Sequence, residues 1–84
     1  MHTLHELPNI GSVLENLLNQ VGIHSEEELK KAGSKEAFRM IKLIDPTACQ
    51  SMLMALEGAI EGVRWHNLAD EVKQELKAYF KTFQ

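Results

Sequence analysis

The sequence predicts an all-α domain built from five helices. No stretch alternates apolar and polar residues in the manner of a β-strand, and no Asn-Gly or Asp-Gly pair marks a hairpin turn. Apolar residues instead recur at helical spacing in successive segments. Short runs containing glycine, proline or capping residues separate these segments. With 84 residues, the chain is expected to form a single domain over residues 1–84, with its folded core between about residues 5 and 80.

The stretch "LPNIGSVLENLLNQVGI", residues 7–23, predicts a tight turn, a helix and a second turn. Leu7 and Ile10 are expected to be buried, while the turn between them stays exposed. Gly11 permits a positive φ in the turn, and the following helix presents unpaired N–H groups. Gly22 is placed to end this helix. Its apolar stripe comprises Val13, Leu14, Leu17, Leu18 and Val21.

Two helices are expected next. Ser25 is a suitable N-cap with Glu28 three residues later, which is the pattern of a capping box. This second helix is short and should end near Gly33. Ser34 can then cap a third helix. The side chains of the third helix expected to face inward are Ala37, Phe38, Ile41 and Ile44.

The fourth helix is expected to follow Asp45–Thr47, with Pro46 in its first turn, where proline is tolerated. Because it is apolar around much of its circumference, it should be the central and most buried helix. Its apolar residues are Met52, Leu53, Leu56, Ala59, Ile60 and Val63. Asn67 followed by Asp70 predicts the cap of a fifth helix. The apolar residues of this last helix are Leu68, Val72, Leu76, Tyr79, Phe80 and Phe83.

The charge of the chain is unevenly distributed. The formal net charge is −3, which gives no overall attraction to nucleic acid. The segment 30–42 nevertheless carries +4, from Lys30, Lys31, Lys35, Arg39 and Lys42 against a single glutamate. The last three share one face of the third helix. This stripe could follow a phosphate backbone or contact an acidic partner, but an ordinary solvated helix face is the commoner case.

The N-terminal turn offers a second candidate contact site. A phosphate can dock on the free N–H groups around Gly11, Ser12 and Val13, as in helix-hairpin-helix motifs. Asn9, however, stands where those motifs commonly have glycine, and Glu15 replaces a basic residue and repels phosphate. We therefore favour a turn used for packing, with phosphate contact as the alternative.

The segment "ALEGAIEGVRW", residues 55–65, carries small residues on adjoining faces of one helix. Gly58 and Gly62 in particular allow another helix to approach closely. Glu57 and Glu61 exclude a membrane dimer motif. Trp65 is expected to be a core plug whose indole N–H is bonded locally, with a ligand or partner anchor as the alternative.

Signs of catalysis are weak, so no enzyme, cofactor or metal site is expected. Cys49 is the sole cysteine, has no nucleophile signature and should be a buried small apolar residue. Glu57 and Glu61 are expected to be surface charges. The longest apolar run has five residues and the N-terminus is not a secretory signal, so no membrane contact and a cytoplasmic location are expected. The four histidines, His2, His5, His24 and His66, are scattered without metal-ligand spacing.

Three segments together resemble the C-terminal domain of the TfoX (Sxy) family, bacterial regulators of competence for DNA uptake. They are "LPNIG" (residues 7–11), "VGIHSEEEL" (21–29) and "ALEGAIEGVRWHNL" (55–68), and they occur in the expected order. The third is the most specific. The resemblance implies an all-helical domain similar to the SAM-like or helix-hairpin-helix fold. It also implies a usual position after a separate α+β domain, so this chain would be either a standalone homologue or part of a longer protein.

The resemblance supplies no catalytic residue and implies structural roles for the matched positions. Gly11 would shape the turn, Gly58 and Gly62 would permit close approach, and Trp65 would fill the core. The first functional hypothesis is a regulatory module that binds another protein, for example in the transcription machinery, or a second copy of itself. The alternative is weak, sequence-independent DNA binding through residues 11–13, Lys30, Lys31 and the basic stripe of the third helix.

Overall fold

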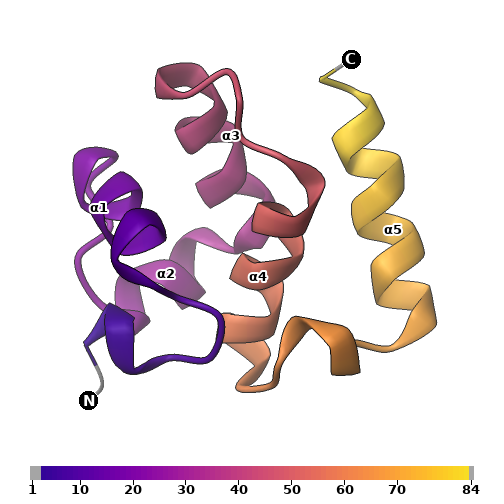
Figure 1. The fold of residues 1–84 in the computed structure, drawn as a ribbon, viewed down its shortest axis with the longest axis horizontal. Helices are drawn as coiled ribbons and strands as arrows, with labels where there is room; N and C mark the ends of the chain where they lie inside the picture. Colours follow the sequence, from indigo (N-terminus) through magenta and orange to yellow (C-terminus); the bar gives the residue numbers. More distant parts are fainter. Residues whose placement is uncertain (1–2, 84) are drawn as a thin grey trace.

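The computed structural model describes residues 3–83 and contains five α-helices and two short 3₁₀ helices (Figure 1). No strand occurs between residues 3 and 83, which confirms the predicted all-α, five-helix fold. None of the described helices is long and apolar enough to cross a membrane. The elements in chain order are η1 (Leu4–Glu6), α1 (Ser12–Gln20), α2 (Glu26–Ala32), α3 (Ser34–Ile44), α4 (Gln50–Glu61), η2 (Trp65–Asn67) and α5 (Asp70–Lys81).

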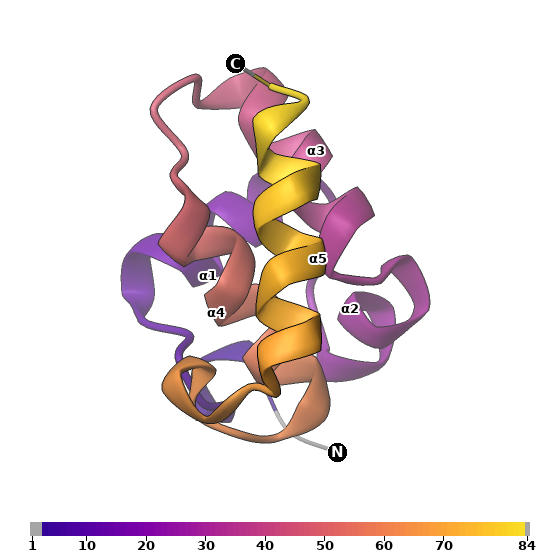
Figure 2. The same cartoon turned by 90° about the vertical axis from the view of Figure 1, so that its right-hand side faces the viewer.

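Helix α4 lies at the centre of the molecule and contacts α2, α3, α5 and η2. Figure 1 shows α1 and α2 on one side of it and α5 on the other, and Figure 2 shows α5 running lengthwise in front of α3 and α4. Half of its residues are buried, a larger share than in any other described helix, so the prediction that the fourth helix is the central and most buried one is confirmed. These residues are Leu53, Met54, Ala55, Leu56, Gly58 and Ala59.

An aromatic cluster holds α5 against α3. Phe38, which is fully buried, contacts Phe80 and Phe83 with ring centroids 5.9 and 5.6 Å apart. Tyr79 adds an edge-on contact with Phe83 at 5.3 Å, and its hydroxyl donates a hydrogen bond to the Lys35 carbonyl oxygen. Tilted and edge-on geometries are favourable for aromatic pairs. The C-terminal helix is therefore attached to the body of the domain by ring contacts and a polar tie.

Three predicted helix starts were wrong by a few residues. Gly33, at φ 85°, caps α3, so Ser34 is its first residue and uses its hydroxyl to bond Glu57 instead. Helix α4 begins at Gln50, because Asp45 accepts hydrogen bonds from the Thr47 N–H and hydroxyl and closes a separate turn around Pro46.

The start of α5 also differs from the prediction. Asn67 belongs to η2, and α5 follows Ala69 without a side-chain cap. At α2, the Ser25 hydroxyl accepts the Glu28 N–H as predicted, but the Glu28 carboxylate accepts the N–H of His24 rather than that of Ser25. Local capping signals therefore located these helices but did not fix their first residues.

Three residues expected to be buried are exposed. Val13 is 71% exposed and Ile44 is 48% exposed, because each lies at a helix end where no other element covers it. Cys49 is exposed as well, immediately before α4. Leu43, beside Ile44, is 72% exposed. The buried faces of α1 and α3 are thus shorter than their apolar patterns suggest.

Candidate functional site

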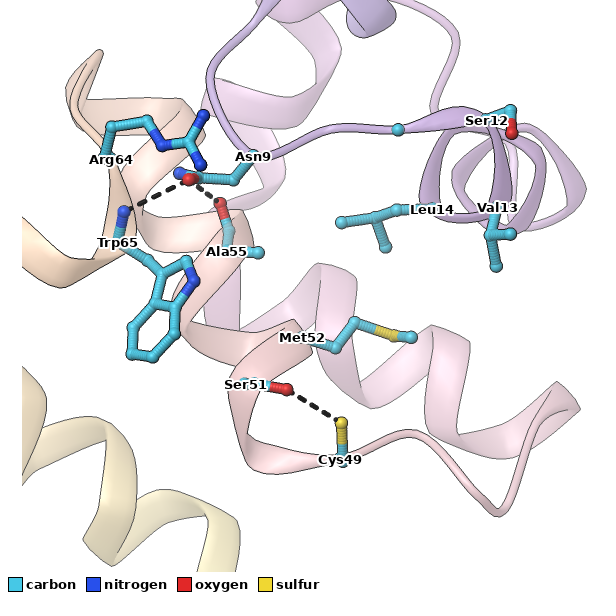
Figure 3. A pocket seen from close by; sticks show the side chains of 11 residues that line it. Asn9, Ser12, Val13, Leu14, Cys49, Ser51, Met52, Ala55, Arg64 and Trp65 are labelled. Carbon is cyan, nitrogen blue, oxygen red and sulfur yellow. Dashed lines mark hydrogen bonds between the residues drawn. The ribbon is translucent and has the colours of Figure 1, made fainter.

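Asn9 connects the N-terminal turn to the central helix. Its amide nitrogen donates to the carbonyl oxygens of Ala55 (3.4 Å) and Val63 (3.0 Å), and its amide oxygen accepts the Trp65 N–H at 3.1 Å. Asn9 also has a φ of 69°, in the left-handed region that asparagine tolerates better than most residues. Figure 3 shows its side chain between Ala55 and Trp65. The expectation of an exposed turn was therefore wrong for Asn9, which is half-buried.

The glycines of the matched segments have roles that differ from those expected. Gly11 has an extended conformation, with φ −95°, so Asn9 and not Gly11 supplies the positive φ of the turn. A Cβ at Gly58 would collide with the Asn9 amide and the Val63 carbonyl oxygen, so close approach is real but involves the turn rather than another helix. Gly62, at φ 78°, has open space around it and ends α4 in the left-handed conformation.

A cavity of about 540 Å³ lies beside this junction (Figure 3). The turn and the start of α1 contribute Asn9, Gly11, Ser12 and Val13 to its lining, which brings four of the predicted contact residues together. The start of α4 contributes Cys49, Ser51 and Met52, and the segment after α4 contributes Arg64 and Trp65. Apolar and polar groups thus share the walls, as is usual in ligand-binding pockets.

The polar part of this lining favours negative charge. None of the lining residues is acidic, although the chain contains 12 acidic residues. Gly11, the N-cap of α1, provides no side-chain cap, so N–H groups in the first turn of α1 remain available, whereas the Met52 N–H in the first turn of α4 already bonds Cys49. Within residues 3–83, the Arg64 guanidinium has neither a hydrogen-bond nor an ion-pair partner. Two hydrogen bonds lower the pKa of the Cys49 thiol. The larger effect comes from the Ser51 hydroxyl and the next from the Met52 N–H.

Trp65 takes part in both the core and the cavity. Its ring is half-buried and packs against the core, stacks on the His66 ring at 3.8 Å, and lines the cavity with its remaining surface. The described part of the chain offers no hydrogen-bond partner to its indole N–H. Trp65 therefore packs against the core as expected, but the local bond predicted for its indole N–H does not occur within residues 3–83.

The predicted basic residues lie elsewhere, and most contact other parts of the chain. Lys35 forms an ion pair with Glu75 of α5 at 2.5 Å and lies over the Tyr79 ring. Lys42 donates to the carbonyl oxygens of Pro46 (2.6 Å) and Ala48 (2.9 Å). None of the five basic residues of segment 30–42 lines the cavity beside Asn9.

The other predicted basic residues lie on the surface of α2 and α3. Arg39 makes two hydrogen bonds to Glu36, and this contact raises the pKa of Arg39. Lys30 pairs with Glu26 at 3.2 Å, and Lys31 is exposed. Within the stripe of the third helix, Lys35 and Arg39 are thus paired with glutamates, whereas Lys42 keeps its charge.

A second cavity, of about 470 Å³, lies beside the start of α3 and is lined by Ser34, Lys35, Glu57 and Glu75, among others. The Ser34 hydroxyl donates to Glu57 at 2.6 Å. A hydrogen bond with Glu57, together with burial and the Glu57 charge, raises the pKa of Glu61 to about 7. Glu61 is exposed and Glu57 is half-buried, so both carboxylates lie at the surface as expected, and the finding beyond that expectation is their coupling.

The described residues hold no group of three or more His, Cys, Asp or Glu side chains that could bind a metal ion. His2 lies outside them. His5 contacts Glu15 through both its backbone N–H and its ring.

Sequence reasoning did not identify Arg64, Met52 or Cys49 as neighbours of the N-terminal turn. The only signal was their position in or near the distinctive segment 55–68, and nothing in the local pattern indicates that residue 9 meets residue 65. That meeting depends on the path of the whole chain around α4.

Comparison with known proteins places these features in a family. The sequence matches the family model described as the TfoX C-terminal domain over residues 1–80. It is 33% identical over 73 residues to Protein Sxy of Escherichia coli, a match that covers 87% of this chain but 35% of the relative. The chain thus spans about a third of the length of that protein.

The fold also matches solved structures. An uncharacterized protein from Listeria monocytogenes, crystallised in a triclinic form, is 51% identical, with a TM-score of 0.95 over 96% of this chain and 92% of that chain. A tetragonal crystal form of a Listeria monocytogenes protein of unknown function gives 51% identity and a TM-score of 0.94 over 96% and 100% of the two chains.

Proposed function

The chain belongs to the TfoX C-terminal domain family, and from this membership we propose that it is a non-enzymatic regulatory module that acts by binding a partner protein. The proposal includes control of competence for DNA uptake in the bacterial cytoplasm, because the family resembled by the sequence consists of competence regulators. Protein Sxy, a relative with 33% identity, is consistent with this assignment.

The observation that carries the proposal is the cavity next to Asn9, with Val13 at its edge. Val13 is 71% exposed, and Met52 and Trp65 add apolar surface to the same cavity. Concave surfaces that combine apolar side chains with a few polar groups are typical binding sites. The basic stripe supports the proposal less well, because Lys35, Arg39 and Lys42 already have partners within the chain.

Weak, sequence-independent DNA binding is the second candidate function. The N–H groups at the start of α1 and the free Arg64 guanidinium favour it. Against it, Arg64 is the single basic side chain in the lining, and Glu15 follows in the first turn of α1. Strong binding to a phosphate backbone requires several cations in a row.

The test is site-specific photo-crosslinking in the native host. A photoreactive phenylalanine analogue replaces Val13 in one variant and Arg39, an exposed residue of α3, in the control variant. We expect position 13 to give a defined protein adduct and position 39 to give none. An adduct with a second copy of the chain would identify a homodimer at this surface.

Titration of a labelled short duplex DNA by fluorescence anisotropy, at low and near-physiological salt, covers the second candidate. We expect no binding at near-physiological salt. Salt-sensitive binding that disappears in an Arg64→Glu variant, together with no protein adduct at position 13, would contradict the proposal and favour DNA.

A further inference from the structure

We infer that the cavity beside Asn9 binds a short peptide segment of the partner in which an apolar side chain lies next to a carboxylate. This inference rests on the proposed function, because it specifies the chemistry of the partner at that surface. Its basis is the combination of an apolar wall, a free arginine and the absence of acidic groups in one concave site.

The apolar wall would receive the apolar side chain. Val13, Met52 and Trp65 come from three different segments of the chain and face one cavity of about 540 Å³ (Figure 3). This volume lies within the range of about 300–1,000 Å³ that is typical of ligand pockets. Val13 is largely exposed, and covering it would remove apolar surface from water, which is favourable. A fully polar ligand would leave that surface without a suitable partner.

Arg64 would receive the carboxylate. The two arginines of the chain differ in this respect, because Glu36 binds the Arg39 guanidinium through two hydrogen bonds while no described residue binds the Arg64 guanidinium. A guanidinium binds a carboxylate through two parallel hydrogen bonds, which gives both affinity and orientation. The N–H groups at the start of α1 point to the same preference for a negative group.

The charge of the rest of the molecule makes this site distinct. The chain has a net charge of −3 and 12 acidic residues, yet none of them lines the cavity. An acidic group would meet Arg64 and no carboxylate among the described lining residues, so electrostatics would help to select the orientation of the partner. A phosphodiester backbone fits less well, because it offers no apolar group to Val13 and meets one basic side chain only.

Nuclear magnetic resonance of the ¹⁵N-labelled protein tests this inference. The probes are a blocked peptide of alternating leucine and glutamate, the same peptide with glutamine in place of glutamate, and a short duplex DNA. We expect the glutamate peptide, at millimolar concentration, to shift the signals of Ser12, Val13 and Ser51 and of the Trp65 indole. The glutamine peptide should bind about tenfold more weakly, because it lacks the charge-assisted hydrogen bonds.

Arg64→Gln is the critical variant and Arg39→Gln the matched control, since each removes one arginine from an exposed position. Arg64→Gln should weaken the glutamate peptide to the level of the glutamine peptide, and Arg39→Gln should change neither. Equal binding of the two peptides, no binding of either, or stronger shifts of the same signals by DNA would each overturn the inference.

The result is separable from that of the crosslinking test. A protein adduct at position 13 without peptide binding would overturn this inference and leave the proposed function standing. Absence of both would overturn the two together.

Discussion

At the scale of single residues, Asn9 combines two requirements that few side chains meet together. Its backbone takes a left-handed conformation, and its amide serves as donor and acceptor to three positions far along the chain. Glycine would adopt the left-handed conformation but has no side-chain amide, and alanine would meet neither requirement. Gly58 completes the arrangement, because a side chain there would displace the Asn9 amide.

Variants of Asn9 separate these two requirements. We expect Asn9→Gly to lower the free energy of unfolding by about 1–3 kcal/mol, through the loss of the amide hydrogen bonds alone. Asn9→Ala should cost about 1 kcal/mol more, because alanine is strained at positive φ. Chemical denaturation of both variants measures the difference. Equal stability of Asn9→Ala and the parent would show that the amide contacts are not significant.

The sequence predicted the residues of the N-terminal turn but not their roles. Asn9, Gly11, Ser12 and Val13 were recognised because helix-hairpin-helix turns use these positions. The positive φ was expected at Gly11 but occurs at Asn9. Asn9 contacts residues about fifty positions away, and no local sequence pattern contains that information. Cys49 was expected in the core because of its residue type, although its position before α4 leaves it exposed.

At the scale of elements, the C-terminal end of α4 holds two carboxylates, of Glu57 and Glu61, one helical turn apart. The Ser34 hydroxyl donates to Glu57, and Glu57 in turn favours the protonated form of Glu61. The C-terminal end of a helix also disfavours negative charge. A negative Glu61 is therefore unfavourable in the folded domain.

This pair predicts a pH dependence of stability. The Glu57 carboxylate raises the pKa of Glu61 to about 7 in the folded domain, from an ordinary value of 4.5. Between these two pH values, the folded state therefore holds a proton on Glu61 that the unfolded state has lost. Stability should therefore fall as the pH rises from about 4.5 through 7. Glu61→Gln should remove this dependence and, because the side chain is exposed to solvent, stabilise the domain by about 0.5 kcal/mol at pH 8.

Thermal unfolding at pH 5 and pH 8 measures this effect. The parent and Glu61→Gln should differ at pH 8 and agree at pH 5. Glu57→Gln is the matched control on the same pair, since it leaves Glu61 without a charged neighbour and should also flatten the pH profile. An unchanged difference between pH 5 and pH 8 in both variants would contradict the coupling.

The sequence predicted each of the five described α-helices, because the periodicity of apolar residues and the glycines at helix ends are local features of the sequence. The ends were predicted less well where side chains found partners outside their own helix. The Ser34 hydroxyl bonds Glu57 on α4 instead of capping α3. Asp45 accepts from the Thr47 N–H and so forms a turn before α4 begins. Tertiary contacts thus decided boundaries that local preferences left open.

At the scale of the whole molecule, one core connects all five helices. The buried residues form a single cluster that runs from Leu4 to Leu76, with α4 at its centre. Phe38 of α3 connects to α5 through Phe80. Asn9 connects the N-terminal turn to Trp65, which follows α4. A domain of this size with one core is expected to unfold as a unit.

Urea denaturation followed by two probes tests this cooperativity. Trp65 is the single tryptophan of the chain and reports on the junction with the N-terminal turn, whereas far-ultraviolet circular dichroism reports on all helices. We expect the same midpoint from both, with a urea dependence of about 1 kcal/mol per molar. An earlier fluorescence transition would show that the junction opens separately.

The cavity beside Asn9 illustrates what the sequence could not reveal at this scale. Its lining residues come from segments 9–14, 49–55 and 64–65, and the last two meet because the chain turns at Gly62 after α4 and brings residues 64–65 back beside that helix. The all-α class was predictable because it follows from the local periodicity of apolar residues. A site assembled from separate segments was not, because it depends on the path of the whole chain.

The contacts of Asn9 also have a consequence for the order of events during folding. They close loops of 46, 54 and 56 residues, whereas the helices and their short connections form from neighbouring residues. Long loops cost more entropy to close, so these contacts should form after α3 and α4 have paired. Weakening them would then shorten the lifetime of the native state and leave the speed of its formation nearly unchanged.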